Sequence, residues 1–574
     1  MVYHLRVNRE TTHLTTDVLI IGAGAAGMSA AIAAHDSGAR VMLIDRSLIG
    51  RGGATVMAQM TVAAALGDEV ADDWRCHFAD TIKAGRGLCD EELASLVCEQ
   101  APAAIRQMDE WRIGWARHQD GRLRQAEAPG HDRPRCVYVD FLNTGPAVSR
   151  TLRTQVQRRP AIVRIGELSI VDLVIADGMA CGAVGFSVTE GRTVTIAAKS
   201  VILCTGGLTR LYACNSASVN MGGDGYALGL RAGAELIDME FVQFFPIGHL
   251  APRMIGMDPI MWDPFRYKLG GQLLNAEGRE FIGDYDRIEE GHYRATRDVA
   301  TYAILKEVAA GRGSPHGGVY LSFRHVGADK LRAAFGPVID RLQANGIDLT
   351  REPIEVAPIA HYHMGGLRVD AELETRIANL FAAGEAVGGA NGANRLSGNA
   401  ISEALVFGTA AGLKAAARAH GQRGRAWSEV AAQETIALIG GGEMKRANPA
   451  SLIARLQILM DERVGPLRSE AGLSIARAEI AAMKKEIGDT PPPVQSEFDS
   501  MRLDWFDLRN MLLVAESVVL AALARRESRG AHQREDHPDA DSRWLVHQTI
   551  RLDNGRLVLD ALARKHDAMW ETAE

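Results

Sequence analysis

Three glycines near the N-terminus have the spacing of a loop that binds the phosphates of a dinucleotide. Gly22-Ala-Gly24-Ala-Ala-Gly27 follows the apolar run 17–21, and a second apolar run, 40–44, ends at Asp45. The first glycine permits a tight turn, the second lets the backbone approach a pyrophosphate, and the third lets a helix pack closely on a strand. An acid about twenty residues further on can accept hydrogen bonds from a ribose. The order strand, loop, helix, strand and acid predicts a dinucleotide site, and leaves the choice between FAD and NAD open.

Two later segments suit the same kind of cofactor. Ser200-Val-Ile-Leu-Cys204 is an apolar run that leads into Thr205-Gly206-Gly207, and Leu380-Phe-Ala-Ala leads into Gly384-Glu385. The first of these resembles the Ala-Thr-Gly-Gly return loop of two-domain flavoproteins that bind FAD. Three segments spread over the chain and suited to one dinucleotide therefore indicate FAD.

The chain resembles the succinate dehydrogenase, fumarate reductase and aspartate oxidase flavoproteins over nearly its whole length. Five further segments match motifs of that family, namely M-E-x-x-Q-F-H-P, R-D-V, H-Y-x-M-G-G, G-A-N-R and R-x-E-S-R-G-A-H. In this chain they are Met239–Pro246, Thr296–Ala300, His361–Gly366, Gly392–Arg395 and Arg526–His532. The last is long and specific, so the chain is identified as a member of the family and its substrate is left open.

The resemblance implies an α/β fold with a doubly wound, Rossmann-like FAD-binding domain that is split in sequence. An α+β capping domain is inserted into it, and a helical C-terminal domain follows. The expected boundaries are 1–242 and 357–424 for the FAD-binding domain, 243–356 for the cap and 425–574 for the helical domain. Apolar residues at helical spacing over 449–486 and 500–526, with a proline-rich break between them, agree with the last part.

The family's reaction moves a hydride between flavin N5 and one carbon of an activated C–C bond, while a proton moves at the neighbouring carbon. The resemblance implies that Arg395 and His361 hold the substrate carboxylate. A guanidinium suits that task because it stays charged and binds a carboxylate bidentately. The resemblance also implies that Arg297 carries the proton. The alternatives are a structural ion pair for Arg395 and a loop histidine for His361, while Asp298 is interpreted as a helix cap.

The resemblance also implies where FAD is held and how. Respiratory members attach FAD through the histidine of H-T-V-x-A-Q, but this chain has Ala54 at that position, in Ala54-Thr55-Val-Met-Ala-Gln59. Alanine cannot form that bond, so we expect non-covalent FAD. The expected cofactor contacts are Gly22, Gly24, Ala25, Ala26, Gly27, Asp45, Arg46, Gly53, Ala54, Thr55, Thr205, Gly206, Gly207, Asp224, Glu385, Asn399, Ala400 and Ile401.

Two departures from the family concern the far end of the substrate. Phe245 replaces the histidine of Q-F-H-P, which grips the second carboxylate in the family. The family's T-E-G-x-R segment, which supplies its proton relay, is altered in this chain. If the alignment is shifted by one residue, Asp263 and Arg266 keep the spacing between the acid and the arginine of that relay. The alternative is that these two residues form a surface ion pair. Phe245, Phe265 and Trp262 would add aromatic surface there. We therefore predict a substrate less dianionic than fumarate or succinate, with one clamped carboxylate or acyl group and an uncharged other end.

Two other enzyme functions compete with this one. The first is an oxidase or dehydrogenase like L-aspartate oxidase. Those enzymes bind the substrate amine with a glutamate, but this chain has alanine at the aligned position, and Glu127 lies one residue away from that position. The second is a flavoprotein subunit that passes electrons to an iron–sulfur partner. A non-catalytic binding protein is the least favoured, because Arg297, His361 and Arg395 are all present.

Composition narrows the remaining possibilities. The 574 residues suggest several domains, and a net charge of −7 argues against nucleic acid as a partner. No apolar run is long enough to span a bilayer, and the first residues lack the pattern of a signal peptide. The seven cysteines form no C-x-x-C pair, so we expect no metal site, and their odd number suits a reducing cytoplasm.

Overall fold

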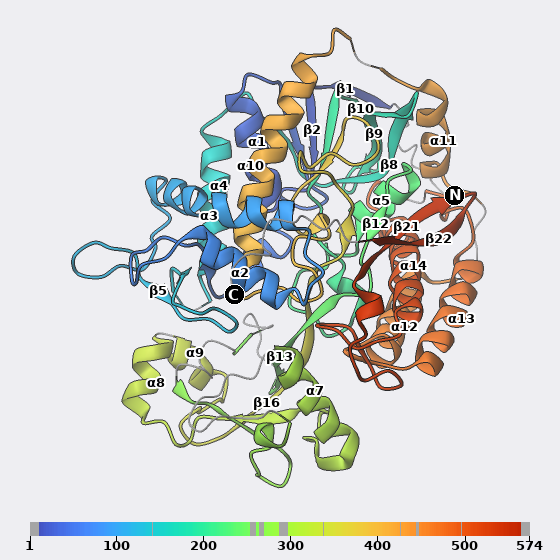
Figure 1. Cartoon of the computed structure of the whole chain (residues 1–574). Helices are drawn as coiled ribbons and strands as arrows, with labels where there is room; N and C mark the ends of the chain where they lie inside the picture. Colours follow the sequence, from blue (N-terminus) through green and yellow to red (C-terminus); the bar gives the residue numbers. More distant parts are fainter. Residues whose placement is uncertain are drawn as a thin grey trace, which may run out of the picture.

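The computed structural model describes residues 11–140, 142–252, 260–262, 269–285, 297–336, 338–424, 426–442, 447–494 and 496–563, and at 297, 298 and 563 the backbone alone. It is a mixed α/β structure in which the cofactor-binding part, a smaller lobe below it and a bundle of helices beside it are all visible (Figure 1).

A five-stranded parallel sheet forms the centre of the cofactor-binding part, in the order β18-β11-β2-β3-β7. Its strands are β2 (Val18–Ile21), β3 (Val41–Ile44), β7 (Val163–Ile165), β11 (Ser200–Leu203) and β18 (Leu380–Ala382). All except β7 are buried along their whole length. Burial on both faces explains why these strands are continuous apolar runs in the sequence.

Helices α1 (Ala25–Asp36) and α10 (Asn399–His420) pack against each other beside this sheet (Figure 1). A Cβ atom at Gly408 would lie 2.3 Å from the carbonyl oxygen of Ala26, so only glycine permits this separation. By length and composition α10 could also cross a membrane, but 61% of its most apolar stretch is buried inside the protein. In this structure α10 is a core helix.

The remaining elements of this part complete its layers. A second sheet has the order β1-β10-β9-β8, and a small one has the order β4-β6-β5. Their bounds, and those of the accompanying helices, are β1 (Thr12–Thr15), β10 (Thr193–Ala197), β9 (Met179–Ser187), β8 (Leu168–Ala176), β4 (Val62–Ala63), β6 (Cys136–Val137), β5 (Gln125–Ala126), α2 (Trp74–Ala84), α3 (Glu91–Glu110), α4 (Thr144–Gln157) and α5 (Asp224–Arg231).

The smaller lobe is joined to the rest by two long antiparallel strands, β13 (Val242–Ala251) and β16 (Ile354–His363), as Figure 1 shows. The lobe also contains β14 (Gln272–Leu274), β15 (Val319–Ser322), α7 (Arg297–Glu307), α8 (Ala328–Phe335) and α9 (Val338–Ala344). It has a hydrophobic core of its own, which includes Phe245, Trp262 and Phe335. The ends of β13 and β16 nearest the main body carry Phe245 and His361, so the two strands position these residues.

The last part of the chain is a helical bundle with a β-hairpin. Helix α11 (Glu429–Ile439) comes first in this part of the chain and packs against β8 and β9. The bundle and the hairpin consist of α12 (Pro449–Arg463), β19 (Leu467–Arg468), α13 (Glu470–Ile487), α14 (Ser500–Ala524), β20 (Gln533–Arg534), β21 (Val546–Asp553) and β22 (Arg556–Ala563). The predicted helical spacing over 449–486 belongs to two helices separated by β19. The hairpin was not predicted, and β21 pairs with β12 (Leu236–Ile237), which in turn pairs with β17 (Gly366–Leu367).

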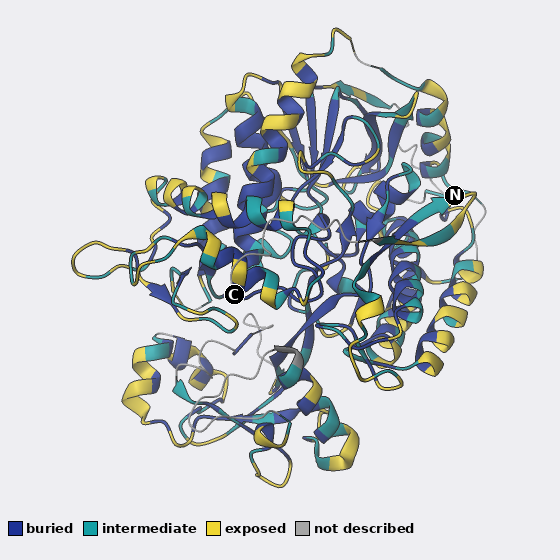
Figure 2. Ribbon diagram, viewed as in Figure 1, coloured by how far each residue is buried: buried dark blue, intermediate teal, exposed yellow. Residues whose placement is uncertain are grey.

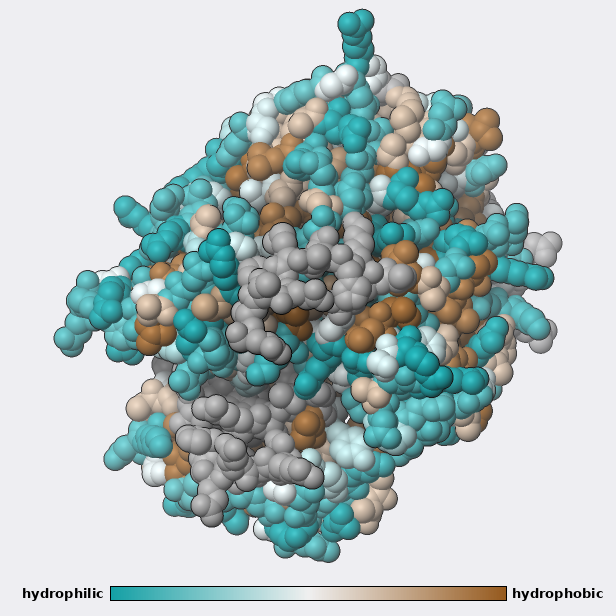
Figure 3. All heavy atoms as spheres, viewed as in Figure 1, coloured by the Kyte–Doolittle hydropathy of each residue, from teal (hydrophilic) through white to brown (hydrophobic). Residues whose placement is uncertain are grey.

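Buried residues concentrate in the parallel sheet and in the helix faces turned toward it, whereas α8 and the outer side of α13 are largely exposed (Figure 2). On the face in Figure 3, hydrophobic residues lie in small groups among hydrophilic ones.

Candidate active site

A cleft with an empty volume of about 1240 Å³ opens at the carboxyl ends of β2, β3, β11 and β18. Doubly wound sheets bind their ligands at this edge. Most of the residues predicted to contact FAD line it together, although they come from distant segments. They are Gly22, Gly24, Ala25, Ala26, Asp45, Arg46, Gly53, Ala54, Thr55, Thr205, Gly206, Asp224, Glu385, Ala400 and Ile401.

The glycine loop has the geometry that a phosphate-binding turn requires. Gly22 has a φ of +104°, and a Cβ atom there would lie 2.3 Å from the carbonyl oxygen of Cys204. The loop leads into the first turn of α1, where the helix dipole favours a negatively charged phosphate. The buried hydroxyl of Thr205 lines the cleft and has no hydrogen-bond partner within the described part of the chain. The cleft therefore offers donors to a bound dinucleotide.

Asp45 is fixed at the end of β3 by backbone N–H groups. One carboxylate oxygen accepts a hydrogen bond from the N–H of Ala23 at 2.7 Å, and the other accepts one from the N–H of Ser47 at 2.8 Å. This arrangement holds the carboxylate at the cleft, where a ribose could reach it.

Arg46 and Asp224 form an ion pair of 3.1 Å at the edge of the cleft. Arg46 also donates a hydrogen bond of 2.8 Å to Asp507 on α14. Burial lowers the pKa of the Arg46 guanidinium, but the charges of Asp507 and Asp224 outweigh burial and raise that pKa above its usual range. Helix α14 thus helps to hold Arg46 at the cofactor cleft. No motif near Asp507 indicated this contact in the sequence.

Gly27, Gly207 and Asn399 lie beside the cleft instead of lining it. A Cβ atom at Gly27 would lie 1.8 Å from the carbonyl oxygen of Gly22, so this glycine serves the packing of α1 on β2. The side chain of Asn399 faces α2: it accepts a hydrogen bond of 2.8 Å from His77 and donates one of 3.1 Å to Thr81.

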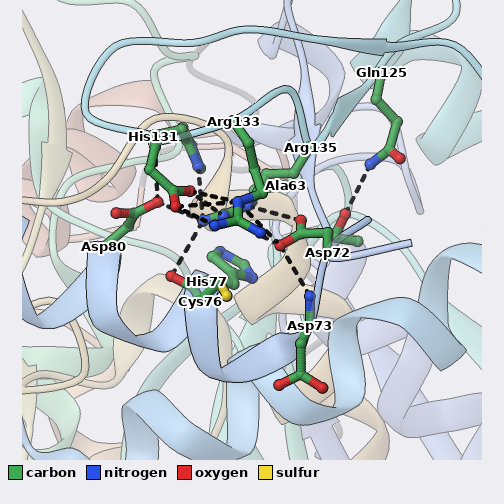
Figure 4. Close-up of polar contacts among 12 residues, drawn as sticks. Ala63, Asp72, Asp73, Cys76, His77, Asp80, Gln125, His131, Arg133 and Arg135 are labelled. Carbon is green, nitrogen blue, oxygen red and sulfur yellow. Dashed lines mark hydrogen bonds and ion pairs between the residues drawn. The ribbon is translucent and has the colours of Figure 1, made fainter. Parts of the chain in front are cut away.

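A buried arginine, Arg135, lies among acidic side chains near His131 (Figure 4). Arg135 is fully buried and pairs with Asp72, Asp80 and Asp132. Beside it, the Nε2 atom of His131 donates a hydrogen bond of 2.7 Å to the carbonyl oxygen of Ser397. Burial lowers the pKa of His131 to about 3, so the ring is neutral at pH 7. No sequence motif indicated these contacts, because their partners are scattered along the chain.

His361 and Tyr362 line one end of the cleft. The Nδ1 atom of His361 lies 2.7 Å from the hydroxyl oxygen of Ser216, which lines the same cleft. The ring of Phe245 meets the ring of His361 edge-on, with centroids 5.6 Å apart and an interplanar angle of 63°. An apolar ring therefore adjoins the predicted carboxylate-binding histidine.

Arg395 is buried directly behind Tyr362. Its Cζ atom lies 4.3 Å from the centroid of the Tyr362 ring, and its guanidinium donates a hydrogen bond of 3.1 Å to the side-chain oxygen of Gln243. The amide nitrogen of Gln243 donates in turn to the carbonyl oxygen of Arg395 at 3.0 Å. The predicted carboxylate clamp, His361 and Arg395, is thus only partly at the cleft: His361 lines it, whereas Arg395 lies against Tyr362 and does not.

Other predicted residues lie elsewhere or outside the described residues. Asp263, Arg266 and Phe265 lie outside them, and so does the side chain of Arg297, whose backbone begins α7. Trp262 does not line the cleft: it is fully buried in the core of the smaller lobe, with its ring centroid 5.8 Å from that of Phe335. The expectation that Trp262 adds aromatic surface to the substrate pocket was wrong.

The comparisons with known proteins show the family to which the chain belongs. Residues 17–401 match the family described as FAD binding domain, and residues 453–566 match the family described as fumarate reductase flavoprotein C-term. One subunit of the fumarate reductase (CoM/CoB) of Methanothermobacter marburgensis is 36% identical over 533 residues, 92% of this chain and 95% of that protein. L-aspartate oxidase of Streptomyces coelicolor is 32% identical over 559 residues, 95% of this chain and 92% of that protein.

A solved structure agrees as well. Sdh1 of Mycobacterium smegmatis, in complex with UQ1, superposes with a TM-score of 0.86 at 34% identity, over 97% of this chain and 95% of that one. The fold and the cleft define an FAD-dependent oxidoreductase. The chain belongs to the flavoprotein family of the fumarate reductases, succinate dehydrogenases and L-aspartate oxidases.

Proposed function

We propose that this flavoprotein transfers a hydride between flavin N5 and one carbon of a C–C bond that is next to a carboxylate. The proposal depends on one observation: His361 and Tyr362 line the cofactor cleft, and the guanidinium of Arg395 lies over the ring of Tyr362. FAD supplies the hydride acceptor or donor when it is bound. His361 and Arg395 bind the carboxylate and so hold the neighbouring carbons at a fixed place, which is where much of the rate gain of such a reaction arises.

Arg297 is the proposed proton carrier. It begins α7, which packs against β13, the strand that carries Phe245. An arginine has a pKa far above neutrality, so it can deliver a proton only if a neighbouring group replaces that proton. Asp263 and Arg266 are the proposed relay.

The substrate is proposed to have an uncharged end opposite its clamped carboxylate. Phe245 is 1% exposed and lies against His361, where an imidazole would be needed to bind a second carboxylate. A carboxylate that loses its water and finds no partner is strongly disfavoured in such a place. Met57 and Met261 line the cofactor cleft and add apolar surface to it, whereas Phe245 lies behind His361 in the core of the smaller lobe. Fumarate and succinate should therefore be poor substrates.

FAD is proposed to be held without a covalent bond. Ala54, which lines the cleft, stands where the respiratory members of the family have the histidine that is bonded to FAD, and its methyl group cannot form such a bond. We also propose that the protein works in the cytoplasm, where the thiols of its seven cysteines would stay reduced.

The test is an anaerobic reaction of the bound flavin. Crotonate and cinnamate, which have one carboxylate, are added to dye-reduced protein, and fumarate is added to a parallel sample. Reoxidation by a monocarboxylate supports the proposal. No reoxidation by any enoate, together with bleaching of the oxidised flavin by aspartate, would replace it with an oxidase.

A second candidate function is that of an electron-transferring subunit with an iron–sulfur partner. It is favoured by the relatives, because the protein of M. marburgensis is named as one subunit of its enzyme and aligns over 92% of this chain. Co-purification of an iron–sulfur protein with the untagged chain would support it. The aspartate oxidase alternative is less well supported by geometry: Glu127 is exposed and does not line the cleft. Peroxide release during reoxidation by air would favour that alternative.

A further inference from the structure

A buried glutamate stands behind the predicted carboxylate clamp. Glu403, on the first turns of α10, is 1% exposed, and one of its carboxyl oxygens, Oε2, accepts a hydrogen bond of 2.9 Å from the hydroxyl of Tyr362. The same oxygen accepts a second hydrogen bond, of 2.6 Å, from the side-chain amide of Asn391. The other oxygen, Oε1, is buried and has no hydrogen-bond partner within the described part of the chain.

Tyr362 connects this glutamate to Arg395. Its hydroxyl is bonded to Glu403, while the face of its ring lies under the guanidinium of Arg395 at 4.3 Å. The attraction between a guanidinium and an aromatic ring is strongest when the cation lies over the ring face, so the place of the ring matters to Arg395. Tyr362 itself is 4% exposed and is held at its far end by the Glu403 bond. Tyr362 is therefore a physical link between Glu403 and Arg395.

The charged and titratable groups that interact with Glu403 lie on four segments of the described chain. Tyr362 lies on β16, Arg395 lies in the loop before α10, Glu385 lies on the short helix η5 (Gly384–Ala386), and Tyr226 lies on α5. Burial raises the pKa of Glu403 to about 7, although the bonds from Asn391 and Tyr362 and the charge of Arg395 oppose that rise. Burial raises the pKa of Glu385 to about 8, and the charge of Glu403 adds to that rise. Helix α1 meets α10 further along, where alanine backbone faces Gly408.

We propose that Glu403 is a positioning residue that acts through Tyr362 to fix the place of the Arg395 guanidinium, and with it the affinity of the site for the substrate carboxylate. The inference rests on the proposed function, because it assumes that Arg395 binds a carboxylate. Glu403 also links carboxylate binding to protons. A bound anion beside Arg395 disfavours a second negative charge nearby, so Glu403 takes up a proton when the carboxylate binds.

The chain offers variants that separate positioning from folding. In Glu403→Gln, the amide oxygen can occupy the place of Oε2 and keep both hydrogen bonds, while the amide nitrogen replaces the unpartnered Oε1. Glu403→Leu removes both bonds. Tyr362→Phe keeps the ring under Arg395 and removes only the hydroxyl. Lys414→Gln, on the exposed side of the same helix, is the matched control.

The measurement is the dissociation constant of crotonate and of fumarate for the oxidised, FAD-loaded protein, read from the shift of the flavin visible band between pH 6 and 8. The comparison uses the carboxylate that binds the wild type. At pH 6, we expect the dissociation constant of Glu403→Gln for that carboxylate to lie within about 2-fold of the wild-type value. Glu403→Leu should bind about 10-fold more weakly, and Tyr362→Phe should lie between them. The Lys414→Gln control should match the wild type.

The pH profile distinguishes a positioning role from a merely structural one. The wild type should bind carboxylate more weakly as the pH rises through about 7, because an ionised Glu403 repels the ligand. Glu403→Gln should lose that part of the pH dependence. Equal dissociation constants and equal pH profiles in the wild type, Glu403→Gln and Tyr362→Phe would overturn this inference alone. Failure of the wild type to bind either carboxylate would overturn both this inference and the proposed function.

Discussion

Replacing Phe245 with histidine should convert the substrate site toward dicarboxylates. The ring of Phe245 lies 5.6 Å from that of His361, centroid to centroid, so an imidazole there would stand next to the existing one. A hydrogen bond from it to a carboxylate would contribute about 1.5–3 kcal/mol, which corresponds to roughly a 10- to 150-fold gain in kcat/KM for fumarate. The same change removes an apolar ring from the lobe's core and should lower the free energy of unfolding by about 1–3 kcal/mol.

The assay follows reoxidation of the dye-reduced flavin by fumarate and by crotonate in a stopped-flow instrument. Fumarate should reoxidise the flavin of Phe245→His faster than that of the wild type, while the rate with crotonate should be unchanged or lower. Phe244→His is the matched control, because Phe244 is buried on the same strand but packs against Tyr212, with ring centroids 5.1 Å apart. An unchanged fumarate rate in a folded, FAD-loaded Phe245→His protein would refute the reasoning, and so would an equal gain in the control.

Three further predictions follow from particular contacts. Precipitation with trichloroacetic acid should release the flavin into the supernatant, because Ala54 cannot bond to it; flavin that stays with the pellet would contradict this. Arg395→Lys loses the bidentate fork and the stacking on Tyr362, so kcat/KM for the best enoate should fall by about 100-fold, or ~3 kcal/mol, at unchanged FAD content; a fall below 5-fold would argue against the clamp. Glu307 is hydrogen-bonded by Arg312, which lowers the pKa of that carboxyl to about 2. Because the pKa is depressed, its stabilisation is present at neutral pH and is lost as the pH falls from about 4 toward 2. Urea unfolding measures the free energy of unfolding at pH 6 and at pH 3. Between these values the wild type should lose roughly 1–2 kcal/mol more of that free energy than Glu307→Gln does, a figure reduced because Arg312 is partly exposed. Equal losses in the two proteins would contradict this prediction.

Local patterns in the sequence were enough to predict the cofactor edge of the sheet. Strands β2, β3, β11 and β18 are short apolar runs that end in glycines or acids, and each part of that pattern has a local cause. The predicted contacts near Gly22 and Thr205 line one cleft for that reason. The helices α12, α13 and α14 follow likewise from apolar residues at helical spacing.

Contacts between distant residues could not be predicted in this way. Arg46 and Asp507 are separated by 461 positions, and nothing near Asp507 indicates its partner. The same holds for His77 and Asn399, which are 322 positions apart. The pairing of β21 with β12 depends on the packing of the whole bundle. Trp262 was misplaced because an aromatic residue in a substrate-site segment and one in the core of the lobe look alike in the sequence.

Some inferences stay predictions. The domain boundaries at 242, 356 and 424 rest on the resemblance and on element order, and the roles of Asp263, Arg266 and Arg297 rest on the resemblance alone. Mutation of Arg297 to lysine, with the rate of flavin reoxidation measured as a function of pH, would address the proton carrier directly.

The central claim is that one end of the site binds a carboxylate and the other end does not. The most direct test is to add fumarate and crotonate, at equal concentration and without oxygen, to the wild-type protein with its flavin reduced by a dye. We expect crotonate to reoxidise the flavin and fumarate to do so far more slowly. Rapid reoxidation by fumarate, or bleaching of the oxidised flavin by succinate, would contradict this claim and would identify the protein as an enzyme of C4-dicarboxylates.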